Sequence, residues 1–262
     1  MSIEFHHQPG LVAYLTIGDP DLATSKRIAL AAIDAGADVL ELGVPFSDPL
    51  ADGPVIQRAS ERAVRNGTSL GDVLALARSL RDERPHAGLV VFSYLNPILR
   101  MGLEKFASAA EKAGVDAVLV TDLIVEESEE YRAVLRKHHL QPVFLAAPTS
   151  PDDRLMRIAE VSEGFIYAIS RVGITGTQQE LAGDARELVS RLRRYSKLPI
   201  ALGFGISNAA HVAAVAEFAD AVVIGSAIVA RIEQAGAQQA PAAVGAFIAG
   251  LRIPVASESA VF

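Results

Sequence analysis

Two carboxylates that lie eleven residues apart, Glu41 and Asp52, have the clearest potential for chemistry in this sequence. Glu41 lies near the end of an apolar run, where burial without a partner either costs several kcal/mol or raises the carboxyl pKa. Asp52 lies in a loop that also holds Asp48 and three prolines. Two carboxyl groups in different surroundings can act as acid and base near neutral pH, so the segment 41–54 predicts acid–base catalysis. The plainer alternatives are a Glu41 satisfied by backbone donors and aspartates that cap the next helix or brace the loop.

Two glycine-rich turns later in the chain have the pattern of an anion-binding site. GFGIS (203–207) and IGSA (224–227) each follow an apolar run and lead into a predicted helix. Backbone N–H groups and the helix dipole at such a junction favour an anion. One turn alone is weak evidence, because glycine is common where a strand meets a helix. Two turns spaced by one strand–helix unit predict a phosphate site, to which Ser226 adds a hydroxyl donor.

The segment SRVGITGTQQE (170–180) predicts a lid that closes over the ligand and excludes water. Gly173 and Gly176 give its backbone conformational freedom, and Arg171 and Thr175 lie within the same loop. Gly176 could also offer a third N–H group to the phosphate. An ordinary flexible loop is the alternative interpretation.

The elements that must position these residues follow from an alternation of apolar runs and amphipathic stretches. The apolar runs are continuous, which is typical of strands covered on both faces. We expect strands near 11–17, 38–43, 89–94, 116–121, 142–146, 165–169, 199–202 and 220–225. We expect helices near 21–35, 53–66, 70–83, 103–113, 127–138, 151–162, 178–195, 207–217 and 240–250.

Eight strands that alternate with helices predict a parallel sheet with right-handed crossovers. Repeats of roughly 30 residues, with no dinucleotide motif after the first strand, favour a closed (β/α)8 TIM barrel over an open doubly wound sheet. In DAGADVLELG, KAGVDAVLV and EFADAVVIG a helix ends and an aspartate then opens a buried strand. We expect one domain over 1–262, with a core at about 11–250 and a tail at about 251–262 that frays. Chemistry in such barrels lies at the carboxyl ends of the strands.

The composition excludes several classes of function. The 262 residues include no cysteine, which rules out thiol catalysis and disulfides and fits a reducing cytoplasm. The formal net charge is −7 and basic residues such as Arg62 and Arg191 are scattered, so we expect no nucleic-acid binding. No apolar run approaches the roughly 18–20 residues of a membrane span, and we expect no signal peptide. The histidines lack the spacing of a metal clamp, so we expect no metal site.

These motifs together resemble the tryptophan synthase alpha chain family. ELGVPFSDPLADGP (41–54) is similar to the signature of that family and is the most specific part of the match. The match runs in order over 11–232 through YLTIGDP, SYLNPILRMG, SRVGITG, GFGIS and IGSAIV. The resemblance implies a retro-aldol cleavage of indole-3-glycerol phosphate to indole and D-glyceraldehyde 3-phosphate, a step of L-tryptophan biosynthesis, with no cofactor in this chain.

The resemblance also assigns roles to residues. Glu41 matches the catalytic acid/base of the family and Asp52 its second catalytic carboxylate. Tyr167 matches a tyrosine close to the site, and Tyr14 and Phe204 would line the indole pocket. The matches to phosphate-binding positions are Gly176, Gly205, Gly225 and Ser226.

A protein partner is a further implication of the resemblance. The loop that holds Asp48, and also Asn96, match positions that contact a beta subunit in the family. That subunit carries pyridoxal phosphate, in a heterotetramer of two alpha and two beta subunits. Two features depart from the family: ten residues before the first strand leave little room for a helix that usually plugs the barrel, and Ile124 replaces a usual proline. Asp122 is retained, so we expect altered loop stiffness near the partner and unaltered chemistry.

Three alternatives stay open. Another phosphate-binding barrel is possible, such as a sugar-phosphate epimerase or an indole-glycerol-phosphate synthase, although an epimerase would need metal-ligating histidines at strand ends. A stand-alone lyase that releases indole would have nearly the same site. The third alternative is a catalytically silent activator of a beta subunit, which the presence of both Glu41 and Asp52 disfavours.

Overall fold

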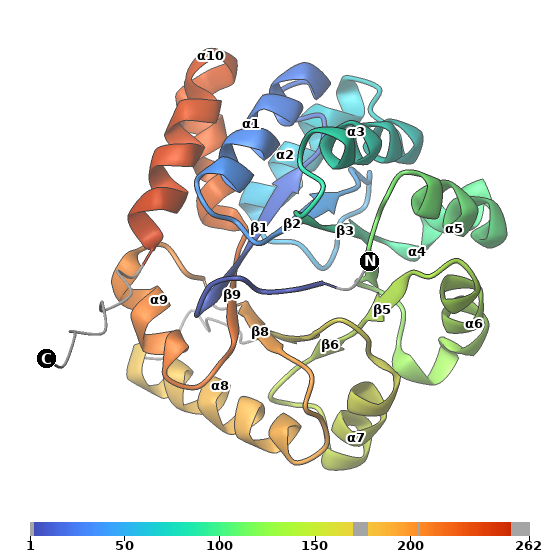
Figure 1. Cartoon of the computed structure of the whole chain (residues 1–262), viewed down its shortest axis with the longest axis vertical. Helices are drawn as coiled ribbons and strands as arrows, with labels where there is room; N and C mark the ends of the chain where they lie inside the picture. Colours follow the sequence, from blue (N-terminus) through green and yellow to red (C-terminus); the bar gives the residue numbers. More distant parts are fainter. Residues whose placement is uncertain (1–2, 170–177, 204, 253–262) are drawn as a thin grey trace, which may run out of the picture.

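Parallel strands form a ring-shaped sheet in the computed structural model, which describes residues 3–169, 178–203 and 205–252. Their order around the sheet is β5-β4-β3-β2-β1-β9-β8-β7-β6, and the helices surround them on the outside (Figure 1). The strands are β1 (Gly10–Thr16), β2 (Val39–Gly43), β3 (Gly88–Ser93), β4 (Ala117–Val120), β5 (Gln141–Val143), β6 (Leu145–Ala146), β7 (Ile166–Ile169), β8 (Ile200–Gly203) and β9 (Ala221–Ile224).

The ring closes through the segment 141–146. Its first half, β5, pairs with β4, and its second half, β6, pairs with β7 on the other side. Only Phe144 separates the two halves. The prediction of a closed TIM barrel is therefore confirmed, with one difference: the expected fifth strand is broken at Phe144, because its two halves bond to opposite neighbours.

Most of the predicted helices are present, and two differ from expectation. A short helix over 95–101 was not predicted, and the last helix begins at Ser226, where IGSA was expected to lead into a helix, and not near 240. None of the described helices is long and apolar enough to cross a membrane. The helices are α1 (Leu22–Asp34), α2 (Pro54–Arg65), α3 (Leu70–Glu83), α4 (Leu95–Met101), α5 (Leu103–Lys112), η1 (Val125–Glu127, a 3-10 turn), α6 (Glu129–Lys137), α7 (Asp152–Val161), α8 (Gln178–Arg193), α9 (Ala209–Ala216) and α10 (Ser226–Leu251).

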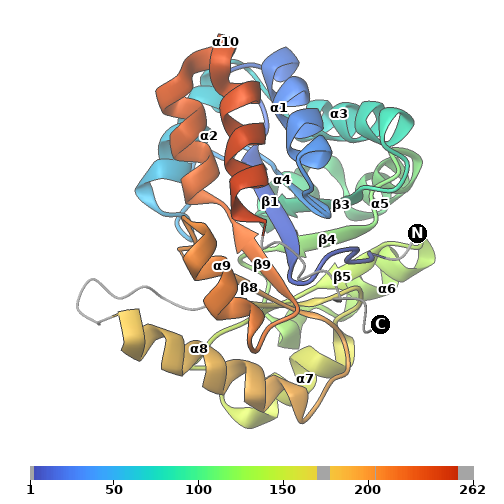
Figure 2. The same cartoon turned by 60° about the vertical axis from the view of Figure 1, so that its left-hand side comes forward.

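Alternate residues of each strand belong to different parts of the core. Leu11, Ala13 and Leu15 of β1 pack in the large cluster between the sheet and the helices. Val12 instead faces the interior of the barrel with its register partner Val39. Because side chains alternate along a strand, Tyr14 and Glu41, two residues further on, also point inward. The helices α1, α2 and α10 cover one side of the ring together (Figure 2).

The repeated aspartates fasten the starts of neighbouring strands. These aspartates, each directly before a strand, are Asp38 before β2, Asp116 before β4 and Asp220 before β9. Each carboxylate accepts a hydrogen bond of 2.7–2.8 Å from the backbone N–H near the start of an adjacent strand. The three donors are Leu11, Leu89 and Ile200. The aspartates that recur in the three similar sequence segments thus anchor the starts of neighbouring strands at the base of the barrel.

An extended N-terminal segment covers the base of the barrel. Residues 3–9 contain no helix, as the short segment before β1 predicted. Ile3 is buried and packs with the inward-facing residues of the strands. Phe5 meets Phe165 edge to face, with ring centroids 6.1 Å apart. The side chains of Ile3 and Phe5 therefore fill the base of the barrel, and the described residues before β1 form no helix there.

Candidate active site

A cavity of about 460 Å³ lies at the carboxyl-terminal side of the strands. This volume lies within the range of small-ligand pockets. It brings together five of the predicted site residues: Tyr14, Glu41, Asp52, Tyr167 and Gly225. The other lining residues are Leu50, Ala51, Gly53, Ile56, Phe92, Thr121, Leu145 and Ile169.

Glu41 is a fully buried carboxyl group in the wall of this cavity. It lies on β2 with a relative exposure of 0% and is in register with Tyr14 on β1. Among the residues that the structure describes, neither of its carboxyl oxygens has a hydrogen-bond partner. Burial raises the pKa of Glu41 to about 8. The group is therefore mainly protonated at neutral pH and can donate a proton.

Asp52 reaches the same cavity from the loop between β2 and α2. The hydroxyl of Tyr94 donates a hydrogen bond of 3.0 Å to its Oδ2 and accepts one of 2.9 Å from the backbone N–H of Ala51. Burial raises the pKa of Asp52 to about 6, and the Tyr94 hydrogen bond works against that rise. The alternative role as a helix cap does not apply, because Gly53 is the N-cap of α2. Asp52 is thus mainly ionised at neutral pH, in the same cavity as a protonated Glu41.

Two tyrosines enter the cavity where glycines leave room for them. A Cβ atom at Gly43 would lie 2.5 Å from the hydroxyl oxygen of Tyr14, and one at Gly203 would lie 2.9 Å from the ring of Tyr167. Real side chains do not tolerate contacts this short, so both positions require glycine. Burial raises the pKa of both tyrosines, which keeps their hydroxyl groups neutral.

The predicted phosphate turns follow adjacent strands. β8 and β9 pair in parallel, so the turns at their carboxyl ends are neighbours. Gly225 is the N-cap of α10, which begins at Ser226, and Ser226 is exposed. Gly205 is exposed and has a φ of +47°, a conformation that favours glycine. The free N–H groups of a helix start and a glycine turn thus lie at the carboxyl-terminal side of the barrel, where an anion is favoured.

Five predicted site residues cannot be placed. They lie outside the described residues and are Arg171, Gly173, Thr175, Gly176 and Phe204. Their assignment to a lid, a phosphate site and an indole pocket stays a prediction.

The two residues predicted to face a partner are both exposed. Asp48 accepts a hydrogen bond from the hydroxyl of Ser47, and Asn96 lies in the first turn of α4. Asp122 supports that turn, because its carboxylate accepts a 2.7 Å hydrogen bond from the N–H of Leu95. Ile124, the departure from the family pattern, is 49% exposed just before η1.

Tyr94 is the main site residue that the sequence did not reveal. It lies at the end of the expected strand 89–94, and no motif in the sequence set it apart from the other residues of that strand. Phe92, which also lines the cavity and meets Tyr14 edge to face at 5.1 Å, was missed for the same reason. The available signal was their place at the carboxyl end of a strand, where barrel chemistry gathers.

Comparison with known proteins decides the family. Residues 2–249 match the family model described as "Tryptophan synthase alpha chain". The chain belongs to this family. It is 48% identical to the tryptophan synthase alpha chain of Solibacter usitatus, over 87% of this chain and 85% of that relative. It is 46% identical to that of Burkholderia thailandensis, over 94% and 91% of the two chains.

Solved structures of the tryptophan synthase alpha chain family share the fold. The tryptophan synthase subunit alpha of Legionella pneumophila superposes with a TM-score of 0.86 at 35% identity and covers 93% of this chain and 91% of that one. A chain of the tryptophan synthase complex from Pyrococcus furiosus superposes with a TM-score of 0.85 at 35% identity, over 93% and 98%. The likeness thus extends over nearly the whole barrel, including the strands that carry Glu41, Tyr14 and Tyr167.

Proposed function

We propose that the chain cleaves indole-3-glycerol phosphate to indole and D-glyceraldehyde 3-phosphate, the alpha-chain step of tryptophan biosynthesis. The observation that carries the proposal is the presence in one cavity of an ionised Asp52 and a buried Glu41 that has no hydrogen-bond partner among the described residues. Environments that separate two carboxyl pKa values assign the acid and base roles of a reaction. The family membership supports the choice of substrate.

Glu41 acts as the proton shuttle. In its neutral form it donates a proton to C3 of the indole ring, which gives an indoleninium cation. The resulting carboxylate then takes the proton from the hydroxyl group on the adjacent carbon of the glycerol chain. As that carbon becomes an aldehyde, its bond to C3 breaks and the electron pair restores the aromatic ring. Glu41 ends the cycle protonated, and acid–base help of this kind contributes roughly 10²–10⁴-fold.

Asp52 stabilises the intermediate cation. Its carboxylate accepts a hydrogen bond from the indole N–H, which becomes more acidic when C3 is protonated. Tyr94 holds this carboxylate through its own hydrogen bond. A preorganised charge of this kind contributes about 2–4 kcal/mol to the transition state, by analogy with other buried electrostatic contacts.

The phosphate anchors the end of the substrate that does not react. Gly205, Gly225 and Ser226 offer a helix start and two turns at the carboxyl end of the barrel, with Gly176 proposed as a further donor. Binding energy gained there holds the reacting carbon against Glu41. We further propose that this chain needs no cofactor of its own and works in the cytoplasm.

The active complex that we propose contains a beta subunit that carries pyridoxal phosphate, in a heterotetramer of two alpha and two beta subunits. The solved structure from Pyrococcus furiosus is titled a tryptophan synthase complex. On this chain, Asp48 and Asn96 are exposed, and so are the nearby apolar side chains of Leu50 and Leu99, which are 91% and 56% exposed.

A turnover assay with matched variants tests the function. Purified chain is incubated with indole-3-glycerol phosphate, with and without a beta subunit, and released indole is measured. Glu41→Gln should lower turnover by at least about 10²-fold, because the amide cannot carry the proton. Circular dichroism and the affinity for inorganic phosphate should stay unchanged.

Glu61→Gln is the control, because Glu61 is an exposed residue of α2 whose partner, Arg65, lies on the same helix. It should release indole like the unmodified chain. Near-normal turnover by Glu41→Gln would remove Glu41 from its role. An unmodified chain that activates a beta subunit but releases no indole would identify a silent activator instead.

A further inference from the structure

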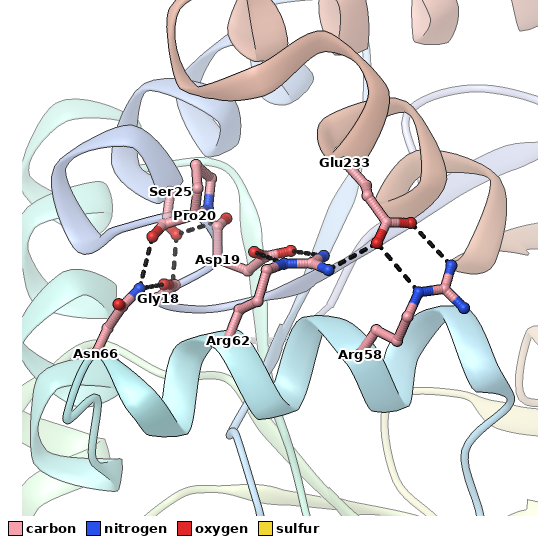
Figure 3. Close-up of polar contacts among 8 residues, drawn as sticks. All are labelled: Gly18, Asp19, Pro20, Ser25, Arg58, Arg62, Asn66 and Glu233. Carbon is pink, nitrogen blue, oxygen red and sulfur yellow. Dashed lines mark hydrogen bonds and ion pairs between the residues drawn. The ribbon is translucent and has the colours of Figure 1, made fainter.

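Three polar side chains at four-residue spacing lie along one side of α2 and its C-cap: Arg58, Arg62 and Asn66 (Figure 3). Arg62 holds Asp19 with a two-pronged contact, since its Nε and Nη2 donate to the two carboxylate oxygens at 2.7 and 2.8 Å. Asp19 is buried at 3% exposure in the loop that follows β1. The planar guanidinium fixes both distance and orientation in such a pair, which one point charge cannot do.

Arg62 also joins α2 to α10. Its third nitrogen, Nη1, donates at 2.7 Å to Glu233, which lies two turns into α10. Arg58 donates to the same carboxylate from Nη2 at 2.8 Å and from Nε at 3.1 Å. The two arginines lower the pKa of Glu233 to about 2, with the Arg58 hydrogen bond as the largest cause. The charges of Asp19, Arg62, Glu233 and Arg58 therefore alternate along one chain of contacts (Figure 3).

Asn66 fastens the same loop from the end of α2. Its side-chain amide donates to the carbonyl oxygens of Gly18 at 3.1 Å and Pro20 at 2.6 Å. Ser25 holds the loop from the other side by accepting a hydrogen bond of 3.0 Å from the N–H of Gly18. The loop after β1 is thus fixed to α2 at several points, of which Arg62 is the only one that also reaches α10 among the described residues.

The three elements joined by Arg62 each contribute to the catalytic cavity. β1 supplies Tyr14, and α2 begins two residues after Asp52. α10 begins at Ser226, directly after Gly225. Arg62 itself lies eight residues beyond the start of α2, or about 12 Å along the helix axis, and does not line the cavity. It can therefore act on the site only through the elements it holds.

We propose that Arg62 is a positioning residue, which acts through Asp19 and Glu233 to set the separation between Asp52 and the phosphate turn at Gly225 and Ser226. This inference rests on the proposed function, because a fixed separation matters only for a ligand that occupies both ends of the site. The contacts with Glu233 are partly exposed and contribute little to stability, whereas loss of Arg62 leaves the buried Asp19 carboxylate unpaired and lowers the free energy of unfolding. The network also joins that carboxylate to two elements of the active site, so we expect an effect on the geometry of the site beyond the loss of stability.

The test compares a ligand that spans the site with the two halves of that ligand. In Arg62→Gln, the KM for indole-3-glycerol phosphate should rise and kcat should fall, with a combined loss in kcat/KM of about 10- to 100-fold from misplacement of the reacting groups. Inorganic phosphate alone and indole alone, measured by calorimetry, should bind within about twofold of the unmodified chain, since each half-site stays intact. A merely structural role would weaken the two halves and the whole ligand alike.

Three further variants sharpen the result. Glu233→Gln leaves the Arg62–Asp19 pair in place. It should lower kcat/KM by a smaller factor than Arg62→Gln and leave the binding of phosphate alone and of indole alone unchanged. The kcat/KM of Arg62→Lys should lie between that of the unmodified chain and that of Arg62→Gln, because an ammonium group keeps the charge but cannot make the two-pronged contact. Arg65→Gln removes an arginine of the same helix that pairs only with Glu61 among the described residues, and it should behave like the unmodified chain.

The outcomes separate the two proposals. An unmodified chain without turnover would refute the proposed function. Normal turnover in the unmodified chain, together with a normal kcat/KM in both Arg62→Gln and Glu233→Gln, would refute the positioning role alone. The positioning role would also be refuted if either variant lost its affinity for phosphate and indole in proportion to its loss in kcat/KM.

Discussion

Burial sets the protonation of the two carboxyl groups of the site. Glu41 has no bonded partner among the described residues, and desolvation alone raises its pKa to about 8. Asp52 is less enclosed and is bonded to Tyr94, and its pKa reaches only about 6. Between these two values the site holds one proton donor and one anion, as the proposed reaction requires.

A bell-shaped pH profile of kcat/KM for indole release follows from these values. Below about pH 6 Asp52 gains a proton and no longer stabilises the cation, so activity falls as the pH decreases. Above about pH 8 Glu41 loses the proton that it must donate, so activity falls as the pH increases. Steady-state rates across the range from about pH 5 to about pH 9 measure both limbs, and a flat profile would contradict the assignment.

Tyr94→Phe tests which limb belongs to Asp52. The variant removes the hydrogen bond that lowers the Asp52 pKa, so the acid limb should move to higher pH while the alkaline limb stays in place.

Sequence reasoning identified Glu41 because a carboxylate within an apolar strand is unusual. It did not identify Tyr94, because a tyrosine in an apolar strand is common. In addition, Asp52, which accepts the hydrogen bond of the Tyr94 hydroxyl, is 42 residues away in the sequence.

At the scale of elements, the barrel depends on the aspartates at the starts of its strands. Asp116 accepts hydrogen bonds from the N–H of Leu89 at 2.8 Å and from Arg81 at 2.6 Å. The Arg81 side chain is only 12% exposed, so it has little access to water as a substitute partner. These contacts tie α3 and β3 to the start of β4.

Asp116→Ala should therefore lower the free energy of unfolding by about 2–4 kcal/mol, because it leaves a largely buried cation without its counter-charge and a buried N–H without its acceptor. Urea unfolding followed by circular dichroism measures the change. Asp82→Ala removes a comparable pair with Arg78, in which both side chains are about 60% exposed, and it should cost less than about 1 kcal/mol. Equal effects of the two variants would contradict the anchoring role.

The boundaries of the elements show how far local patterns reach. The strands lie within a residue or two of their predicted positions, because buried β-branched runs are distinctive. The short helix α4 was missed because Pro97 lies within its seven residues. IGSA was expected to lead into a helix, but the first part of α10 was given no range and was not joined to the last helix, because Gly236, with a φ of +68°, and Pro241 suggest a break. The chain does kink at Gly236, and a helix continues on either side.

At the scale of the whole molecule, the active face and the proposed partner face adjoin. Asp48 and Leu50 belong to the loop that also carries Asp52. A partner that contacts this loop would thus act on the position of the Asp52 carboxylate. The prediction that residues 1–262 make one domain, with a fraying tail, stays a prediction.

Asp48→Ala should leave the indole release of the isolated chain unchanged and weaken its activation by a beta subunit. Loss of one rim charge should cost about 1 kcal/mol of binding, or roughly fivefold in the concentration that gives half-maximal activation. A titration of the beta subunit against a fixed amount of the chain measures this value. Identical titration curves for the variant and the unmodified chain would place Asp48 outside the interface.

Contacts between distant parts of the sequence are the part that no local pattern could predict. Arg62 stood out only as a scattered basic residue, yet it pairs with Asp19 across 43 residues and with Glu233 across 171. Only the closure of the barrel brings these three side chains together.

The way in which the barrel closes also affects how the protein behaves at high concentration. Because the two halves of the broken strand hydrogen-bond to β4 and to β7, no described strand has a long unpaired side. A sheet of this kind gives a second chain, or an extended peptide, no row of free backbone groups on which to add a strand. The native barrel is thereby protected against the edge-to-edge aggregation that threatens open sheets.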